Sequence, residues 1–428
     1  MKYNKEIFNL ALPNILSNIS VPLIASVDTA LMGYQSTSHL AAVGAASMIF
    51  NFLYWNFGFL RMGTTGLVAQ AYGKKDDNER SRAFFQAILI SIIISSLLLI
   101  LQIPLSKLSL HLMNLDGDLS GLASQYFKVR IWDAPATLMI YIVMAWFFGN
   151  QNAIIPLVLT IVINAVNIIT SFIFVRYLHM GIEGVALGSV IGNYVGLIVG
   201  FIAIALKMPV MWHVIKDLKS GFLRFFQINR DIFIRTVMLS STFFMLYAQS
   251  ITFGSLALAV MTVLLQFINW MSYAIDGFAF ACESLVGKYH GANNEKGLKK
   301  VIKLCFVYAI FLALFFSLLY GIFAPNLSRV FSSDHEVINY VSSLRWWLFL
   351  IPLVGFASYI WDGVFVGLTA SKAMRNTMTL SFVFFLLAYY GTRNYLGFES
   401  LLLGLVIYLL VRAVAQSFLF YKRGVELK

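Results

Sequence analysis

The amino-acid sequence predicts an all-α integral membrane protein, with twelve transmembrane helices in two six-helix lobes related by a pseudo-two-fold axis along the membrane normal. Three observations predict this fold class. Hydrophobic residues make up 60% of the 428 residues and charged residues only 12%, unlike a soluble globular domain. Apolar runs of about 18 residues or more, the length that crosses a bilayer, recur along the chain. The two halves of the chain also repeat.

The expected spans are separated by short polar or basic connections. We expect the first apolar stretch to be retained as a span and not cleaved as a signal peptide, because it is long, contains Asp28 and lacks a small-residue cleavage pattern. The spans lie near residues 7–33, 43–70, 84–105, 131–148, 156–176, 183–206, 236–253, 257–287, 301–323, 347–367, 376–396 and 400–421.

Lys and Arg residues gather in alternate connections. The termini and even-numbered connections hold 22 of the 31, the odd-numbered connections hold 7, and Arg61 and Arg412 fall inside spans. Because cytoplasmic loops of membrane proteins are rich in Lys and Arg, we expect a multi-pass protein of the cell membrane with both termini in the cytoplasm. The net charge of +12 then follows from topology, and we expect no nucleic-acid partner.

One ungapped shift of 218 residues relates the halves. It aligns Asn51 with Asn269, Val68 with Val286, Gly73 with Gly291, Tyr141 with Tyr359, and Gly149 with Gly367. Six spans per half is an even number, so the halves share one orientation, a repeat architecture known from secondary transporters.

The repeat predicts three parts of the chain. Residues 1–206 form an N-lobe and residues 236–428 a C-lobe. Between them, residues 207–235 carry apolar side chains at helical spacing among lysines, and we expect a cytoplasmic amphipathic helix on the membrane surface.

The first span holds an acid and two prolines. A charge at bilayer depth costs at least about 2.5 kcal/mol, so Asp28 is a functional candidate by default. Pro13 and Pro22 each remove a backbone hydrogen bond and permit a bend. A bendable helix with one titratable group suits a protein whose conformational change is driven by protons or other cations. The alternative is that Asp28 lies in the interfacial zone.

Three further acids lie in later spans. Asp276 and Glu283 are seven residues apart, hence on one helix face about 10 Å apart, and Asp362 could face the same cavity. Buried carboxylates can exchange protons or pair with a cationic substrate. The alternative is a structural contact with Arg61 or Lys288. None of these acids has an acidic counterpart at the 218-residue shift.

Motifs typical of enzymes are missing from the sequence. It has no P-loop, no Ser-His-Asp arrangement and no pair of acids typical of a hydrolase. The six histidines lack metal-ligand spacing, and Cys282 and Cys305 in apolar stretches indicate no disulfide framework. We therefore expect no enzyme, no metal site and no cofactor beyond a coupling ion.

Four segments resemble the multidrug and toxic compound extrusion (MATE) family of transporters, in its DinF-like branch. The resemblance implies a V-shaped, two-lobed antiporter that exports amphipathic, often cationic organic compounds in exchange for H⁺ or Na⁺ by alternating access. Its partners would be small organic substrates and membrane lipid, and we expect a monomer. The segments are SVDTALMG (26–33), FGFLRMGTTGLVAQAYG (57–73), YAIDGFAFACESLVGKYHGA (273–292) and WDGVFVGLTASKAMRN (361–376).

The resemblance also implies an ion-coupling site in the N-lobe. Asp28 matches the family's coupling aspartate, and Pro13 matches the proline whose bending is linked to its protonation. Asn167, Ser171 and Ser189 match an Asn, an Asp and a hydroxyl residue of relatives, so a second aspartate is replaced by Ser171. One carboxylate can carry a proton, whereas a desolvated Na⁺ needs several oxygen ligands, and we therefore expect H⁺.

The C-lobe departs from the pattern of Na⁺-coupled relatives. Asp362 matches an acid of their site, but residues 236–253 lack the acid that the site also needs. A second function is a lipid-linked saccharide flippase on the related superfamily fold. Such a cleft would present several cations to a pyrophosphate, and only Arg61 and Arg412 lie inside the expected spans.

Overall fold

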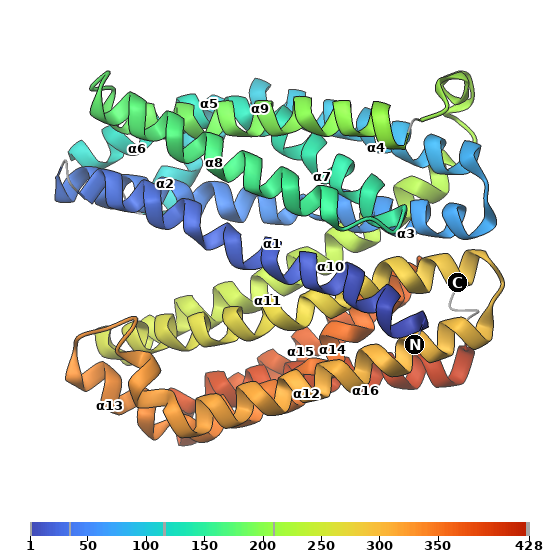
Figure 1. The fold of residues 1–428 in the computed structure, drawn as a ribbon. Coiled ribbons are helices and arrows are strands. Elements are labelled where there is room, and N and C mark those ends of the chain that lie inside the picture. Colours follow the sequence, from blue (N-terminus) through green and yellow to red (C-terminus); the bar gives the residue numbers. More distant parts are fainter. Residues whose placement is uncertain (1, 34–35, 114–116, 209, 425–428) are drawn as a thin grey trace. The chain divides into compact units, whose positions relative to one another are not determined.

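The chain folds into helices joined by short connections (Figure 1). The computed structural model describes residues 2–33, 36–113, 117–208 and 210–424, and the side chains of residues 21–30, 33, 37, 112 and 423 lie outside this description. No strand occurs within these ranges.

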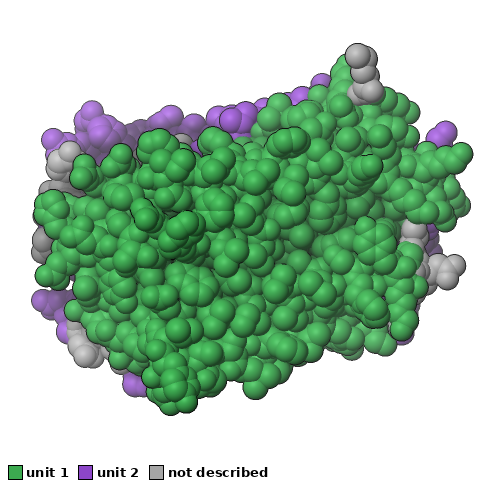
Figure 2. Space-filling model, turned by 90° about the horizontal axis from the view of Figure 1, so that it is seen from below, with its two compact units in different colours: residues 1–15, 226–428 green, residues 16–225 purple. Residues whose placement is uncertain are grey.

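Two compact units divide the chain (Figure 2). Unit 1 contains residues 1–15 and 226–428, and unit 2 contains residues 16–225. The expected N-lobe and C-lobe stay a prediction at their boundaries. In the structure the start of α1 (Lys2–Gly33) packs with the second half of the chain.

Unit 2 is built around α7, which packs against α3, α4 and α9. Most of α7 is apolar and buried, including Trp146 and Phe147 in its last turn. The elements that follow α1 in this unit are α2 (Thr37–Asn56), α3 (Phe59–Lys74), α4 (Asp77–Ile100), α5 (Gln102–Leu112), α6 (Gly117–Arg130), η1 (Ile131–Asp133), α7 (Ala134–Gly149), α8 (Ile154–Arg176), α9 (Gly181–Lys207) and η2 (Trp212–Asp217).

Unit 1 repeats this plan around α14, which packs against α11, α12 and α16. Helix α10 begins in unit 2 and continues into unit 1. The elements are α10 (Phe222–Ser250), η3 (Ile251–Phe253), α11 (Ser255–Gly291), α12 (Glu295–Ser328), α13 (His335–Ser343), α14 (Arg345–Gly367), α15 (Ser371–Leu396) and α16 (Glu399–Arg423).

Most expected spans coincide with helices. Among the described residues, 10 helical stretches are long and apolar enough to cross a membrane; α1 and α15 are long helices outside this set. The expected span over residues 43–70 is two helices, α2 and α3, interrupted at residues 57–58.

Backbone geometry repeats at the 218-residue shift. Where one helix ends and the next begins, both halves use a residue with positive φ. These pairs are Lys75 (60°) with Asn293 (53°), Gln151 (64°) with Thr369 (53°), and His179 (53°) with Gly397 (54°). The turns are therefore duplicated in the same register that the sequence indicates.

Helix packing repeats at the same shift. A methyl group added at Gly149 would lie 2.5 Å from Val68 Cγ1, and one added at Gly367 would lie 3.0 Å from Val286 Cβ. Since Gly149 aligns with Gly367 and Val68 with Val286, the α3–α7 and α11–α14 contacts are equivalent. Only glycine permits either approach.

The described residues between 207 and 235 do not form one continuous helix, and the expected place of this connection on the membrane surface stays a prediction. The turn η2 and the first turns of α10 take the place of that helix. The connection is fastened to α4, because Gln86 Nε2 donates hydrogen bonds to the carbonyl oxygens of Leu218 at 2.8 Å and Ser220 at 2.9 Å. These carbonyls thus find their partner on α4 and not inside a surface helix.

Candidate ion-coupling site

Helices α8 and α9 bring together three of the predicted site residues. Asn167 Nδ2 donates a hydrogen bond to Ser189 Oγ at 2.8 Å, and Ser171 lies one turn further along α8, against Gly188. All three polar side chains are buried. The close approach of the two helices depends on the glycines of α9, since a methyl at Gly188 would overlap Ser171 Oγ.

Two oxygen atoms of this group have unused bonding capacity. Asn167 Oδ1 and Ser171 Oγ are buried and have no hydrogen-bond partner among the residues that the structure describes. A buried polar atom without a partner costs about 1–3 kcal/mol. The pair is therefore suited to receive an O–H donor or a cation.

Helix α1 follows the same face of α8. Ser17 Oγ hydrogen-bonds to Thr160 Oγ1 at 2.8 Å, and Asn164 Nδ2 donates to the carbonyl oxygen of Ser20 at 3.1 Å. Residue numbers rise together along both helices, so α1 and α8 run in the same direction. Thr160 and Asn164 lie on the helix face that continues to the two unsatisfied oxygens, because the spacing is three to four residues throughout.

The side chain of Asp28 lies outside the described residues, and only its place on α1 is given. Position 28 is two helical turns beyond Ser20, and Ser171 is two turns beyond Asn164. The register of the two helices therefore brings position 28 level with Ser171.

Pro13 lies in the first half of α1, which continues through it. Proline has no N–H to donate to the carbonyl of Asn9, four residues earlier. The boundary between the units falls between residues 15 and 16, so α1 passes from one unit to the other about one half-turn beyond Pro13.

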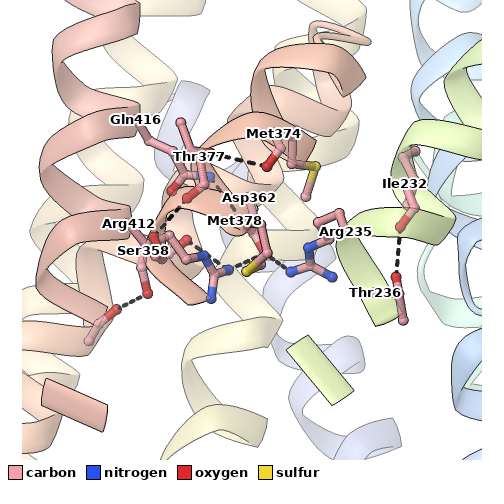
Figure 3. A network of polar contacts seen from close by, with 12 residues as sticks. Ile232, Arg235, Thr236, Ser358, Asp362, Met374, Thr377, Met378, Arg412 and Gln416 are labelled. Carbon is pink, nitrogen blue, oxygen red and sulfur yellow. Dashed lines mark hydrogen bonds and ion pairs between the residues drawn. The ribbon is translucent and has the colours of Figure 1, made fainter. Parts of the chain in front are cut away.

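In unit 1 the dominant polar group is a buried ion cluster (Figure 3). Arg235 of α10 and Arg412 of α16 both form ion pairs with Asp362 Oδ2 on α14. Gln416 Nε2 donates to Asp362 Oδ1 at 3.1 Å, and Arg412 also donates to the carbonyl oxygen of Ser358 at 3.3 Å. Asp362 is thus held by three side chains from two neighbouring helices.

Unit 2 contains a second buried carboxylate, Asp133, which is fully excluded from solvent. It forms an ion pair with Arg130 and accepts a hydrogen bond from the Tyr54 hydroxyl. Asn193 Nδ2 donates to Asp133 Oδ2 at 2.8 Å and to Thr137 Oγ1 at 3.1 Å. This network ties α2, α6, α7 and α9 together at η1.

Comparison with known proteins identifies the family. A family profile described as MatE matches residues 13–173 and 232–390. DNA damage-inducible protein F of Escherichia coli K12 is 32% identical over 97% of this chain and 91% of that protein. This chain belongs to the MATE family. It is therefore a multi-pass membrane transporter and not an enzyme.

Further MATE proteins agree with this assignment. A probable multidrug resistance protein NorM of Thermotoga maritima is 24% identical over 78% of this chain and 74% of that protein. A crystal structure of the Vibrio cholerae MATE transporter VcmN matches with a TM-score of 0.89 at 18% identity, covering 100% of this chain and 99% of that chain. The expected twelve-helix, two-lobe MATE fold is confirmed.

The three acids expected to share a cavity in this MATE chain differ in their burial and in the contacts that the structure gives them. Asp362 is engaged by the two arginines. Asp276 is half-buried on α11, and its charge acts on the same Arg235. Glu283 is buried where α11 meets α14, and its carbonyl oxygen would lie 2.6 Å from a methyl at Gly367. Asp276 therefore lies within electrostatic reach of Arg235, and Glu283 lies at the contact between α11 and α14.

Lys288 and Arg61, the cations considered as structural partners of Asp276 and Glu283, both have other neighbours in the structure. Lys288 Nζ lies 3.3 Å from Glu6 Oε1 in unit 1. The guanidinium of Arg61, in unit 2, lies over the ring of Phe148, with 5.9 Å between Cζ and the ring centroid. Glu6 is therefore one partner of Lys288, and Phe148 is one neighbour of Arg61.

The boundary expected at residue 235 stays a prediction, but the structure shows the surroundings of Arg235. It lies inside α10, with 7% of its surface exposed. The signal for this was available, because the buried residues Phe225, Ile228, Ile232 and Leu239 continue the helical period on both sides of it. Arg235 is therefore a buried helical cation to be considered beside Arg61 and Arg412.

The Asp133 network was also missed. The sequence shows Asp133 only as an acid at the edge of an expected span. Its partners Tyr54 and Asn193 are 79 and 60 residues away along the chain, so no local spacing predicts them.

Proposed function

We propose that this chain is a monomeric secondary antiporter that exports small amphipathic, often cationic organic compounds across the cell membrane in exchange for H⁺. Its termini would lie in the cytoplasm, and Asp28 would be the coupling carboxylate. The transport part is supported by relatives named for multidrug resistance and for multidrug and toxin extrusion. The coupling part rests on one observation, the two unsatisfied oxygens of Asn167 and Ser171 beside the path of α1.

A proton fits these oxygens better than a metal cation. A protonated carboxyl group has one O–H to donate, and Asn167 Oδ1 or Ser171 Oγ can accept it. Hard metal cations need several oxygen ligands, preferably including charged ones. Ser171 is uncharged, and Ser189 Oγ already accepts a hydrogen bond from Asn167. This set of ligands favours H⁺ over Na⁺.

Protonation would be coupled to movement of α1. An ionised Asp28 is costly between helices at bilayer depth, whereas the neutral acid can be buried there and hydrogen-bonded. Near Pro13 the helix lacks one backbone hydrogen bond and passes between the units, so bending is easiest there. Proton binding would favour one position of α1 and substrate binding the other, and this opposition produces antiport.

The experiment is transport by the purified full chain in proteoliposomes. A pH gradient should drive accumulation of a lipophilic cation in the wild type, and Asp28→Asn should abolish it, because the amide cannot exchange a proton. Asp118→Asn is the matched control, since Asp118 is exposed on α6 and should leave transport unchanged.

Two results would contradict the proposal. One is full proton-driven transport by a folded Asp28→Asn protein. The other is wild-type transport that responds to an imposed Na⁺ gradient and not to a pH gradient.

A lipid-linked saccharide flippase is the second candidate. Arg235 favours it, because it adds a buried cation on α10 to Arg61 and Arg412. Against it, Arg235 and Arg412 both bond to Asp362, so their charge is already partly neutralised. Binding of a polyprenyl pyrophosphate in preference to lipophilic cations would reverse the order of the two candidates.

A further inference from the structure

A pocket of about 170 Å³ lies in unit 2 where α4 begins. Its charged lining residues are Asp76, Glu79, Arg82 and Arg224, and Leu67 and Phe225 are among its apolar lining residues. None of these residues belongs to the candidate ion-coupling site. The pocket also has no role in the proposed proton coupling.

The connection between the two halves of the chain forms one side of the pocket. Gln86, with only 4% of its surface exposed, donates hydrogen bonds to the carbonyl oxygens of Leu218 and Ser220. Arg82 forms an ion pair with Asp217 at 2.8 Å. These contacts hold the connection against α4 (Figure 1), so the pocket is a built feature of the fold.

The charges around the pocket are balanced. Its lining has two carboxylates and two guanidinium groups. Glu79 pairs with Lys74 at 2.7 Å and Arg82 with Asp217, which adds one charge of each sign. A pocket that presents both positive and negative groups suits a zwitterion better than a simple anion, because the carboxylates would repel an anion.

Exposed apolar side chains lie on the same connection. Trp212, Ile215 and Leu223 expose 70%, 43% and 69% of their surface. In a membrane protein, such residues beside charged groups mark the level where headgroups meet acyl chains. Basic pockets between membrane helices bind anionic lipid headgroups, and a charge-balanced pocket at this level would by the same reasoning suit a zwitterionic headgroup.

We propose that this pocket binds the headgroup of phosphatidylethanolamine. The phosphate would contact Arg82 and Arg224, the ammonium would contact Asp76 and Glu79, and the acyl chains would lie along Trp212 and its apolar neighbours. The recognised chemistry is phosphoethanolamine, which could come from the lipid or from the free compound. The apolar surface beside the pocket favours the lipid.

The test measures binding to the purified full chain in detergent by isothermal titration. The probes are dihexanoyl phosphatidylethanolamine, its choline and glycerol analogues, and free phosphoethanolamine. The ethanolamine lipid should bind about tenfold more tightly than the choline lipid, whose quaternary ammonium has no N–H to donate to the carboxylates. The glycerol lipid should also be weaker, because it lacks the cation.

Variants locate the site. Arg82→Gln and Arg224→Gln should each weaken binding about tenfold through loss of a charge-assisted hydrogen bond. Glu79→Gln should remove the preference for the ethanolamine over the glycerol lipid. Lys216→Gln with Lys219→Gln is the control, because these lysines are exposed on the same connection outside the pocket lining and should not change binding.

Several results would overturn the assignment. They are equal affinity for the ethanolamine and choline lipids, unchanged binding by a folded Arg224→Gln protein, or an equal loss in the lysine control. Equal affinity for free phosphoethanolamine would overturn the lipid as the ligand. If loss of the Asp217 pair prevents Arg82→Gln from folding, Arg224→Gln and Glu79→Gln decide the question.

Discussion

Asp133 in unit 2 and Asp362 in unit 1 are two buried acids on corresponding central helices. Asp133 lies in η1, directly before α7, whereas Asp362 lies five residues before the end of α14. At the 218-residue shift Asp133 aligns with Ile351 and Asp362 with Met144. The helix scaffold is therefore duplicated, but its buried charges are at opposite ends.

The two acids also differ in their charge balance. Asp133 has one cationic partner, Arg130, and hydrogen bonds from Tyr54 and Asn193. One carboxylate oxygen of Asp362 forms ion pairs with two guanidinium groups. The first network depends on its single cation, whereas the second depends on its carboxylate. The close helix contacts therefore correspond between the two units, whereas the polar networks differ.

The largest effect is expected when the shared carboxylate of unit 1 is removed. Asp362→Asn leaves Arg235 and Arg412 as buried charges without their common partner. Breaking a buried ion pair in this way costs about 3–5 kcal/mol of stability. Because two cations lose their partner, we expect a loss near the upper end of this range. Denaturation of the purified chain in mixed SDS micelles measures the change. Asp118→Asn should be within the error of the wild type, and equal stability of both variants would contradict the cluster.

Removal of the single cation of unit 2 should have a somewhat smaller effect. Arg130→Met leaves Asp133 buried with only neutral hydrogen-bond donors, at a cost of about 3 kcal/mol. Arg130 is partly exposed, with 17% of its side-chain surface accessible, so water can replace some of the lost interaction. The same denaturation assay applies. Lys128→Met, which removes an exposed cation from α6, is the control.

The smallest effect is expected from removing one of the two cations of unit 1. Arg235→Met leaves Asp362 paired with Arg412, so we expect a loss of about 1 kcal/mol, as for one net hydrogen bond. A loss as large as that of Arg130→Met would show that Asp276 also depends on Arg235. The comparison between Arg235→Met and Arg130→Met thus measures the difference in charge balance between the units directly.

Part of the candidate coupling site could be predicted without a structure. Asn167, Ser171 and Ser189 were expected to meet, and the structure brings them together between α8 and α9. The resemblance to the family supplied this grouping, because Ser189 lies on another helix than Asn167 and Ser171 and no spacing along one helix relates them; their role in ion coupling stays a prediction. The surroundings of Asp276, Glu283 and Asp362 could not be predicted in this way, because their partners lie on helices far apart in the chain.

The connection between the halves shows the same limit. Its apolar spacing predicts a surface helix, but Gln86 binds its backbone carbonyls and η2 forms instead. A pattern within the connection carries no information about a hydrogen-bond donor on another helix that competes for its carbonyl oxygens. That competition is a tertiary effect.

The sequence by itself determined the class of the protein, its helical spans and its repeat. Hydropathy and span length are local quantities, and burial in a bilayer requires every span to satisfy its own backbone as a helix. Only the tertiary structure decided which charges meet. Arg235 reaches Asp362 across 127 residues of chain, and this pairing depends on how three helices pack, which no spacing along one helix contains.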